Sequence, residues 1–197
     1  MSKKSAEAVT GPPPPRTSKP TPPDRIPRVI VAPTLDDHLE VMTRAIFQAG
    51  LSWALIDARW DAFRTAFEGF SVKLIATTYG DGDVERIMAA DGVIHSRAKI
   101  AGTIANAKAL LALGETHEDV ARYVRSFPTY DALYADARKR FAYLGDLSLY
   151  YWLFRTGLPV PPFERWMERQ ERDHPRMREL VEMGRSEHRT SETAAAS

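Results

Sequence analysis

The sequence predicts an all-α fold, and three observations lead to this prediction. From Thr34 onward, apolar residues recur at spacings of three and four, which is the period of an α-helix. Glycines and prolines interrupt this pattern at intervals that suit helices joined by short turns. The chain has no convincing run of alternating polar and apolar residues bounded by hairpin turns, because its one β-rich stretch, residues 28–32, is isolated and flanked by prolines.

The composition limits the classes of protein that this chain can belong to. It has 197 residues, of which 44% are hydrophobic and 27% are charged, enough for one domain with a sizeable core. The formal net charge of +1 predicts no bulk attraction to nucleic acid, so such a partner has to meet a local patch. The absence of cysteine excludes a disulfide scaffold, a thiolate zinc site and a cysteine nucleophile. Because no apolar stretch reaches the roughly 18–20 residues of a membrane span, we expect a soluble, cytoplasmic protein without a membrane partner.

The chain is expected to divide into four segments. Residues 1–33 hold nine prolines and six basic against two acidic residues, which predicts an extended, disordered basic arm. Residues 34–162 carry the helical pattern and form the domain. Residues 163–189 are dense in alternating charges and predict a helical extension, exposed as far as Pro175. Residues 190–197 are expected to be a disordered tail.

The first two predicted helices form an antiparallel pair joined by a short loop. Thr34 is expected to be the N-cap of the first, with Asp37 as its capping-box partner, and Gly50 ends it. Ser52 is expected to cap a second helix that ends before Gly69. The inward-facing residues of the pair are Leu35, Leu39, Met42, Ile46 and Ala49, followed by Trp53, Ile56, Trp60, Phe63 and Phe67.

Five more helices are predicted from capping residues and glycine stops. Their expected starts are Asp83, Ser96, Thr116 with Asp119, Thr129 and Asp146, and their expected stops are Gly92, Gly114, Arg140 and Gly157. The longest begins after Ser96 and is expected to direct Ile100, Ile104, Ala107 and Leu111 inward.

No single motif identifies an enzyme. The sequence contains no phosphate-binding loop, dinucleotide-binding glycine turn, nucleophile elbow or HExxH helix. Its five histidines are scattered along the sequence, and no two of them stand at helical spacing from each other. We therefore expect no metal and no cofactor.

The junction between the first two helices is the first candidate site. A tight turn at Gly50 can thrust Leu51 outward, where a leucine could act as a wedge in a DNA duplex. Trp53 supplies a flat stacking surface for a base, and Gln48 supplies a donor and an acceptor for base edges. The alternative interpretation is that Leu51 and Trp53 are ordinary core packing between two helices.

The second candidate site is the segment from Phe141 to Asp146. A turn containing Gly145 would expose backbone N–H groups at a helix N-terminus, where they bind phosphate without reading sequence. The basic triplet of residues 138–140 would add electrostatic attraction. Ordinary packing of two helices needs the same glycine and cap, so the segment alone leaves both interpretations open.

Taken together, these segments resemble the DNA-3-methyladenine glycosylase I family, a branch of the helix-hairpin-helix DNA glycosylase superfamily. The match is strongest in the QAGLSW sequence of residues 48–53. The elements DVERIM, GVI, R-x-KI and NA, which lie between Asp83 and Ala107, are similar to the family's in order and spacing. YLGD, residues 143–146, resembles the family hairpin more loosely. The resemblance covers about residues 33–112 well and 130–160 faintly.

The resemblance implies a compact helical bundle that acts on double-stranded DNA as a monomer in base excision repair. The implied activity is hydrolysis of the N-glycosidic bond of an alkylated purine such as 3-methyladenine. The implied substrate-binding residues are Gln48 and Trp53. The implied DNA-binding residues are Gly50, Leu51, Arg97, Lys99, Lys139, Leu144 and Gly145.

The sequence departs from the family at three places. Ala45 stands where the family has a base-contacting glutamate, three residues before the signature glutamine. The family's N-terminal zinc site uses Cys and His, whereas this chain has no Cys and carries residues 25–32 in place of the aromatic, acidic stretch. Many helix-hairpin-helix glycosylases outside this branch have an aspartate about twenty residues after the hairpin. Here the nearest acid at that distance is Glu164, the candidate catalytic residue; the alternative is that it caps or decorates the following helix.

Two further functions remain open from the sequence. The chain could be a noncatalytic binder of damaged or distorted DNA that keeps the wedge and the hairpin. It could also be a helical protein-interaction module that uses its Pro-rich arm as a ligand for polyproline-reading domains.

Overall fold

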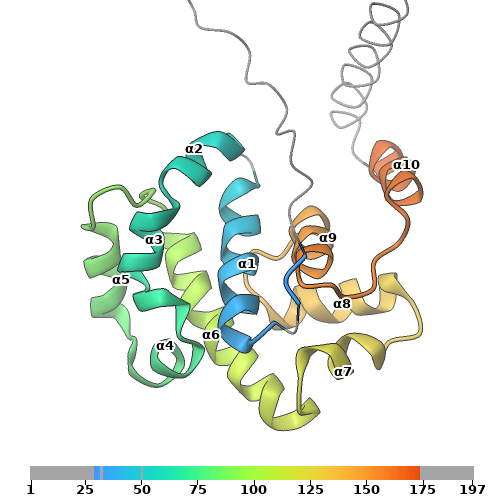
Figure 1. The fold of residues 1–197 in the computed structure, drawn as a ribbon, viewed down its shortest axis with the longest axis horizontal. Coiled ribbons are helices and arrows are strands. Elements are labelled where there is room, and N and C mark those ends of the chain that lie inside the picture. Colours follow the sequence, from blue (N-terminus) through green and yellow to red (C-terminus); the bar gives the residue numbers. More distant parts are fainter. Residues whose placement is uncertain (1–28, 32, 50, 174–197) are drawn as a thin grey trace, which may run out of the picture.

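The computed structural model describes residues 29–31, 33–49 and 51–173, with side chains as far as Gln170. This part of the chain is helical and contains no strand, which confirms the predicted all-α fold (Figure 1). Most of the Pro-rich arm, Gly50 and the C-terminal tail lie outside the described residues. The helices are α1 (Leu35–Gln48), α2 (Trp53–Ala58), α3 (Trp60–Ala66), the 3-10 turn η1 (Glu68–Phe70), α4 (Val72–Thr78), α5 (Asp81–Met88), α6 (Arg97–His117), α7 (Val120–Arg125), α8 (Tyr130–Arg140), α9 (Asp146–Arg155) and α10 (Phe163–Asp173).

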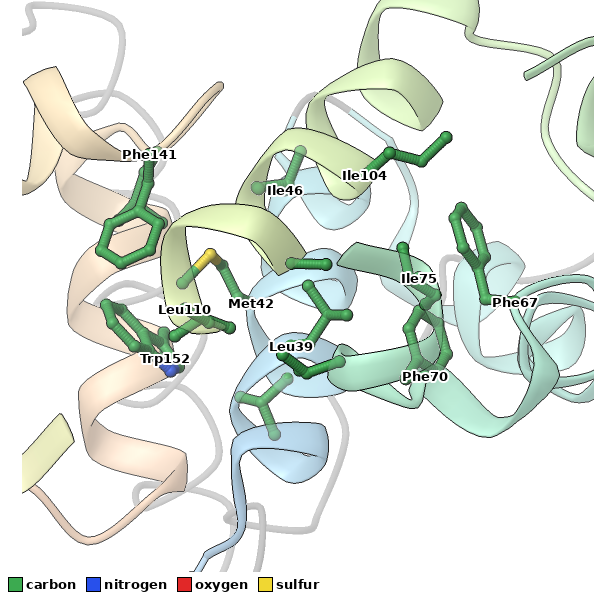
Figure 2. Close-up of a cluster of buried hydrophobic side chains, with 14 of the residues drawn as sticks. Leu39, Met42, Ile46, Phe67, Phe70, Ile75, Ile104, Leu110, Phe141 and Trp152 are labelled. Carbon is green, nitrogen blue, oxygen red and sulfur yellow. The ribbon is translucent and has the colours of Figure 1, made fainter. Parts of the chain in front are cut away.

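Helix α1 forms the centre of the fold. It packs against α9 on one side and against α4 and α6 on the other. Its buried side chains Leu39 and Met42 lie between Trp152 of α9 and Ile75 of α4 (Figure 2). The predicted capping box is confirmed at its start, since the Thr34 Oγ1 atom accepts from the Asp37 amide at 3.2 Å and Asp37 Oδ2 accepts from the Thr34 amide at 2.8 Å.

The second predicted helix is wrong as a single element, although its apolar stripe is buried as expected from Ile56 onward. The chain leaves helical geometry at Arg59 and again at Gly69, so α2, α3 and η1 replace one long helix. The side chain of Ser52 does not cap α2. The breaks let aromatic rings stack around one end of the core: the centroids of Trp60 and Phe70 lie 5.5 Å apart, nearly parallel.

Several helix ends also differ from the prediction. Helix α5 begins at Asp81, and the Asp83 carboxylate accepts from the Gly80 amide at 3.0 Å instead of capping from outside the helix. Helix α6 continues through Gly114 because burial of its inner face outweighs the low helix propensity of one glycine. Thr116 consequently lies within α6, and Asp119 caps α7 without it. Helix α4 was not predicted.

The remaining predicted ends hold with smaller changes. Helix α5 ends at Met88, a few residues before the expected stop Gly92, whose φ of 82° places it in a left-handed turn. The helix begun by Thr129 ends at Arg140, as expected. Gly145 is the N-cap of α9, so Asp146 is the first helical residue and not the cap. Leu111, which was expected to face inward, is half-buried, while its neighbour Leu110 is fully buried.

No described helix is both long enough and apolar enough to cross a membrane.

Helix α10 is docked on the bundle, so the expectation of an exposed helix is wrong for one of its faces. Trp166 and Gln170 are buried. The Trp166 ring stacks on Tyr150 of α9 with centroids 4.4 Å apart. Although most residues of this segment are charged, Trp166 and Gln170, one helical turn apart, form a buried face.

A buried histidine joins α1 to α9. The Trp152 indole N–H donates to His38 Nδ1 at 3.0 Å, and both side chains are buried. Burial lowers the pKa of His38 from 6.5 to about 4, although Asp37 and Asp119 oppose this shift. The imidazole is therefore neutral at physiological pH and accepts the indole hydrogen bond.

We expect the folded protein to lose stability as the pH falls from 6.5 towards 4. In this range the unfolded chain protonates His38 and the folded protein does not, so each step down in pH favours unfolding. The free energy of unfolding should fall by about 1.5 kcal/mol between pH 6.5 and 5, measured by urea denaturation. His38→Asn should remove this dependence, and an equal slope in that variant would contradict the assignment.

Candidate functional site

The turn after α1 is held in place by a lysine from another helix. Lys99 of α6 donates from Nζ to the Ile46 carbonyl at 2.8 Å and to the Ala49 carbonyl at 3.1 Å. A cation at these positions satisfies carbonyls that the helix C-terminus leaves without partners. Burial lowers the pKa of Lys99. The contacts of Lys99 therefore fix the turn; its direct binding to DNA stays a prediction.

This turn presents one apolar side chain to solvent beside one aromatic ring. Leu51 is 38% exposed, as the wedge interpretation expected, and its amide donates to the Gln48 carbonyl at 3.3 Å. Trp53 is half-buried and packs edge-to-face against Tyr151 of α9, with ring centroids 5.0 Å apart. Gly50 lies outside the described residues.

A small cavity, which we call the Trp53 cavity, lies between α1, α2 and α9. It has a volume of about 10 Å³, enough for about one water molecule. Its lining residues are Ala45, Gln48, Ala49, Trp53, Leu147 and Tyr151. The structure thus brings the two predicted substrate-binding residues, Gln48 and Trp53, to the same cavity.

Gln48 is the polar side chain of this cavity. It is 4% exposed, and its Nε2 donates to Asp57 Oδ1 at 3.3 Å. Its Oε1 atom is buried without a hydrogen-bond partner in the described structure. A buried carbonyl oxygen left without a donor costs free energy, and the Trp53 cavity has room for a water molecule or a ligand group that could supply the donor.

The predicted hairpin between α8 and α9 is clamped by α6. Asn106 is buried; its Oδ1 accepts from the Ala142 amide at 2.7 Å and its Nδ2 donates to the Ala142 carbonyl at 3.1 Å. The Tyr143 ring lies against Gly102, where an added Cβ would come within 2.6 Å of the ring. Tyr143 itself is 54% exposed and has a φ of 57°, in the left-handed region that non-glycine residues seldom adopt.

An open groove of about 850 Å³ runs alongside this hairpin, and we call it the hairpin groove. Gly145 and the first turn of α9 line one wall, and Arg138 lines another. No side chain caps α9, so its first-turn N–H groups stay available to an acceptor in the groove. Ala49 and Leu147 line both the groove and the Trp53 cavity, which makes the two adjacent.

Asp146 lines the hairpin groove and links the start of α9 to α10 by hydrogen bonds. Its Oδ1 accepts from the Tyr130 hydroxyl at 2.7 Å and from the Trp166 indole at 3.1 Å. Its Oδ2 accepts from Arg169 and Gln170, and Gln170 also lines the groove. With its acceptors occupied in this way, the carboxylate is a structural anchor at the start of α9.

The other predicted site residues lie away from the Trp53 cavity. Arg97 is exposed and pairs with Glu85, Lys139 is exposed at the end of α8, and Leu144 is buried in the core. Glu164 is exposed on the first turn of α10 and does not line the Trp53 cavity. The catalytic role of Glu164 and the DNA-binding roles of the other three stay predictions.

Three residues of the site were missed from the sequence, namely Asn106, Arg138 and Tyr151. Asn106 belongs to the NA element, to which the sequence alone gives no role. Arg138 belongs to the basic triplet of residues 138–140, and the structure places Arg138 in the lining of the hairpin groove. Tyr151 could not be singled out from its aromatic neighbours Tyr150 and Trp152, because only the rotation of α9 decides which ring faces the cavity.

The zinc site of the resembled family does not fit this chain. The chain has no cysteine. Within the described residues, no group of three or more metal-ligating side chains lies close enough together to hold a metal ion. We derive no chemistry from a metal.

Comparison with known proteins places residues 32–159 within the sequence profile of methyladenine glycosylase. The DNA-3-methyladenine glycosylase of Haemophilus influenzae is 26% identical over an alignment of 132 residues, and the match covers 56% of this chain and 71% of that protein. DNA-3-methyladenine glycosylase 1 of Escherichia coli is 35% identical over 80 residues, 41% of this chain and 42% of that protein.

Solved structures show the same fold. A crystal structure of 3-methyladenine DNA glycosylase I superposes with a TM-score of 0.56 at 28% identity, over 62% of this chain and 79% of the other. The Staphylococcus aureus enzyme superposes with a TM-score of 0.57 at 20% identity, over 66% of this chain and 79% of that one. Helix α10 lies beyond the segment that the family profile matches.

Removal of the Asn106 clamp should loosen the hairpin. In Asn106→Ala, the Ala142 amide and carbonyl lose their buried partners, which should lower the free energy of unfolding by about 2–3 kcal/mol. Hydrogen exchange of the Ala142 amide should accelerate more than exchange in α1. Lys108→Ala, at an exposed position of the same helix, is the control and should change neither measurement. Unchanged exchange at Ala142 in Asn106→Ala would contradict the clamp.

Proposed function

The chain belongs to the methyladenine glycosylase family, and from this premise we propose that it is a monofunctional DNA glycosylase. It hydrolyses the N-glycosidic bond of alkylated purines such as 3-methyladenine, in base excision repair. Its substrate is double-stranded DNA that contains an alkylated base, on which it acts as a monomer in the cytoplasm.

One observation carries this proposal: the exposed Leu51 lies close in sequence to Gln48 and Trp53, which together line one small cavity. Leu51 points to solvent within three residues of Gln48, whose buried Oε1 has no partner. A leucine at this place can fill the gap that an everted base leaves in the duplex. The everted base would then lie on Trp53, with its exocyclic amino group donating to Gln48 Oε1.

The hairpin groove supplies the backbone contact. The N–H groups of the first turn of α9 and the positive end of its dipole favour a phosphate in the groove. Arg138 adds a positive charge to the same groove. These contacts carry no sequence information, which suits an enzyme that has to find a lesion in any sequence.

The chemistry that this site can perform relies on the lesion itself. A 3-alkylated adenine is cationic, so when the bond between C1′ and the base breaks, the bonding electrons neutralise the base. Water then bonds to C1′ and loses a proton, leaving an abasic sugar. No carboxylate lines the Trp53 cavity in the described structure, so orientation and aromatic stacking of a good leaving group carry the reaction.

We expect base release to depend on the wedge and the stacking surface. Purified protein is incubated with methylated genomic DNA, and every released base is quantified by chromatography and mass spectrometry. Wild-type protein should release 3-methyladenine, and the Leu51→Ala, Trp53→Ala double variant should release at least about a hundredfold less. A folded wild-type protein that releases no base from any lesion would exclude glycosylase activity.

Gln48 is expected to recognise the base. Gln48→Met keeps the length of the side chain but removes the acceptor, and should slow single-turnover release of 3-methyladenine about tenfold. Binding to an abasic duplex should stay unchanged, because that ligand has no base to contact. Equal loss of abasic-duplex binding would show instead that Gln48 only supports the turn.

A second candidate function is favoured by the closed cavity. With Ala45 in place of the family glutamate and room for about one water, the protein could bind damaged DNA without cleaving it. Preferential binding to abasic duplex without base release would establish this alternative. The interaction-module hypothesis rests on the Pro-rich arm, most of which lies outside the described residues.

A further inference from the structure

Tyr151 separates two cavities at the contact between α1 and α9. On one side lies the Trp53 cavity. On the other lies a polar cavity of about 240 Å³, lined by Glu40, Arg44 and Arg155 among others, which we call the Arg155 cavity. Among the residues that line these two cavities, Tyr151 is common to both, so its half-buried ring forms the partition.

A purine is far larger than one water molecule, so the Trp53 cavity has to open before it can hold a base. Ala45 and Ala49 cannot make room, because their side chains have no torsion and α1 is packed in the core. Gln48 is buried and tied to Asp57. If Trp53 is the surface on which the base stacks, Leu147 and Tyr151 are the lining side chains that remain.

These two side chains would open the cavity in different directions. Leu147 also lines the hairpin groove, so its movement would connect the cavity with solvent. Tyr151 has the Arg155 cavity behind it, so its movement would enlarge the enclosed space without shifting a helix. A dry, enclosed site is the one that lets stacking and hydrogen bonds act on the base without competition from water.

The partition has one side-chain tether. Arg155 donates from Nη1 to the Tyr151 hydroxyl at 3.1 Å, and its guanidinium lies over the same ring at 5.7 Å. Arg155 is one helical turn further along α9 and lines the cavity into which the ring would move. Its Nε is buried without a hydrogen-bond partner in the described structure. The Nε–H group is therefore a second donor that the Tyr151 hydroxyl can meet when the ring shifts.

We propose that Tyr151 determines the specificity of the base site. Its ring closes the Trp53 cavity when no base is present and turns towards the Arg155 cavity when a base enters. The space that the ring vacates sets the largest alkyl group that the site admits. This inference rests on the proposed glycosylase function and assigns selectivity to a side chain, not to the missing glutamate.

The test compares DNA alkylated with methyl groups and DNA alkylated with benzyl groups, using single-turnover release of the 3-alkyladenine from each. Tyr151→Ala removes the partition and should raise the ratio of benzyl to methyl base release about tenfold or more over wild type. Leu147→Ala, one helical turn earlier on the same face of α9, is the matched control and should leave this ratio within about twofold. Both variants should retain the wild-type circular dichroism spectrum.

Two conservative variants test the movement and do not depend on a truncated side chain. Tyr151→Phe keeps the ring but loses the tether, so release of the methyl base should accelerate about three- to tenfold with an unchanged ratio. Tyr151→Trp overfills the partition and should abolish base release while binding to abasic duplex persists.

The outcomes separate this inference from the function on which it rests. If wild-type protein releases no base, both are overturned. If wild-type protein is active and Tyr151→Ala has an unchanged ratio, or Tyr151→Trp stays fully active, the assignment of Tyr151 alone is overturned. A shift of the ratio in Leu147→Ala as large as that in Tyr151→Ala would overturn it as well.

Discussion

The packing of α1 against α9 is the constraint on which the rest of this structure depends. The contact buries Trp152 with its hydrogen bond to His38 at one end. Near the other end the Ser148 hydroxyl donates to the Ala45 carbonyl at 3.4 Å, which brings the start of α9 beside the end of α1. The Trp53 cavity and the hairpin groove both lie at this end, because Ala49 and Leu147 line each of them.

Helix α6 then fixes the two candidate DNA contacts relative to each other. Lys99 holds the end of α1, Gly102 receives the Tyr143 ring, and Asn106 clamps Ala142. These residues are three and four positions apart and lie on one face of a helix of 21 residues. If Leu51 and the hairpin groove bind one duplex, a rigid helix that touches both turns keeps their spacing constant. Lys99 and Asn106, which belong to the R-x-KI and NA elements of the sequence, make these contacts.

Helix α10 lies beyond the segment that the family profile matches, and it contacts the same site. Asp146 stands at the first position of α9 and accepts hydrogen bonds from Tyr130, Trp166, Arg169 and Gln170. Three of these four donors lie on α10, beyond the segment that the family profile matches. The start of α9, whose backbone N–H groups face the groove, is therefore braced by an element that the matched segment lacks.

The sequence by itself determined the helical class and the hairpin between α8 and α9, because both follow from local periodicity and glycine stops. Capping chemistry determined the capping box at Thr34. The pairing of Gln48 with Trp53 in one site follows from a contiguous motif. The sequence did not determine the break of the second helix at Arg59, the docked face of α10 or the length of α6, since burial against distant residues overrides local propensity there. Only the tertiary structure decided that Lys99 binds carbonyls, that Asp146 is an anchor and that Tyr151 lines both cavities. Each of these depends on the rotation of one helix about its axis, which packing fixes and local sequence does not.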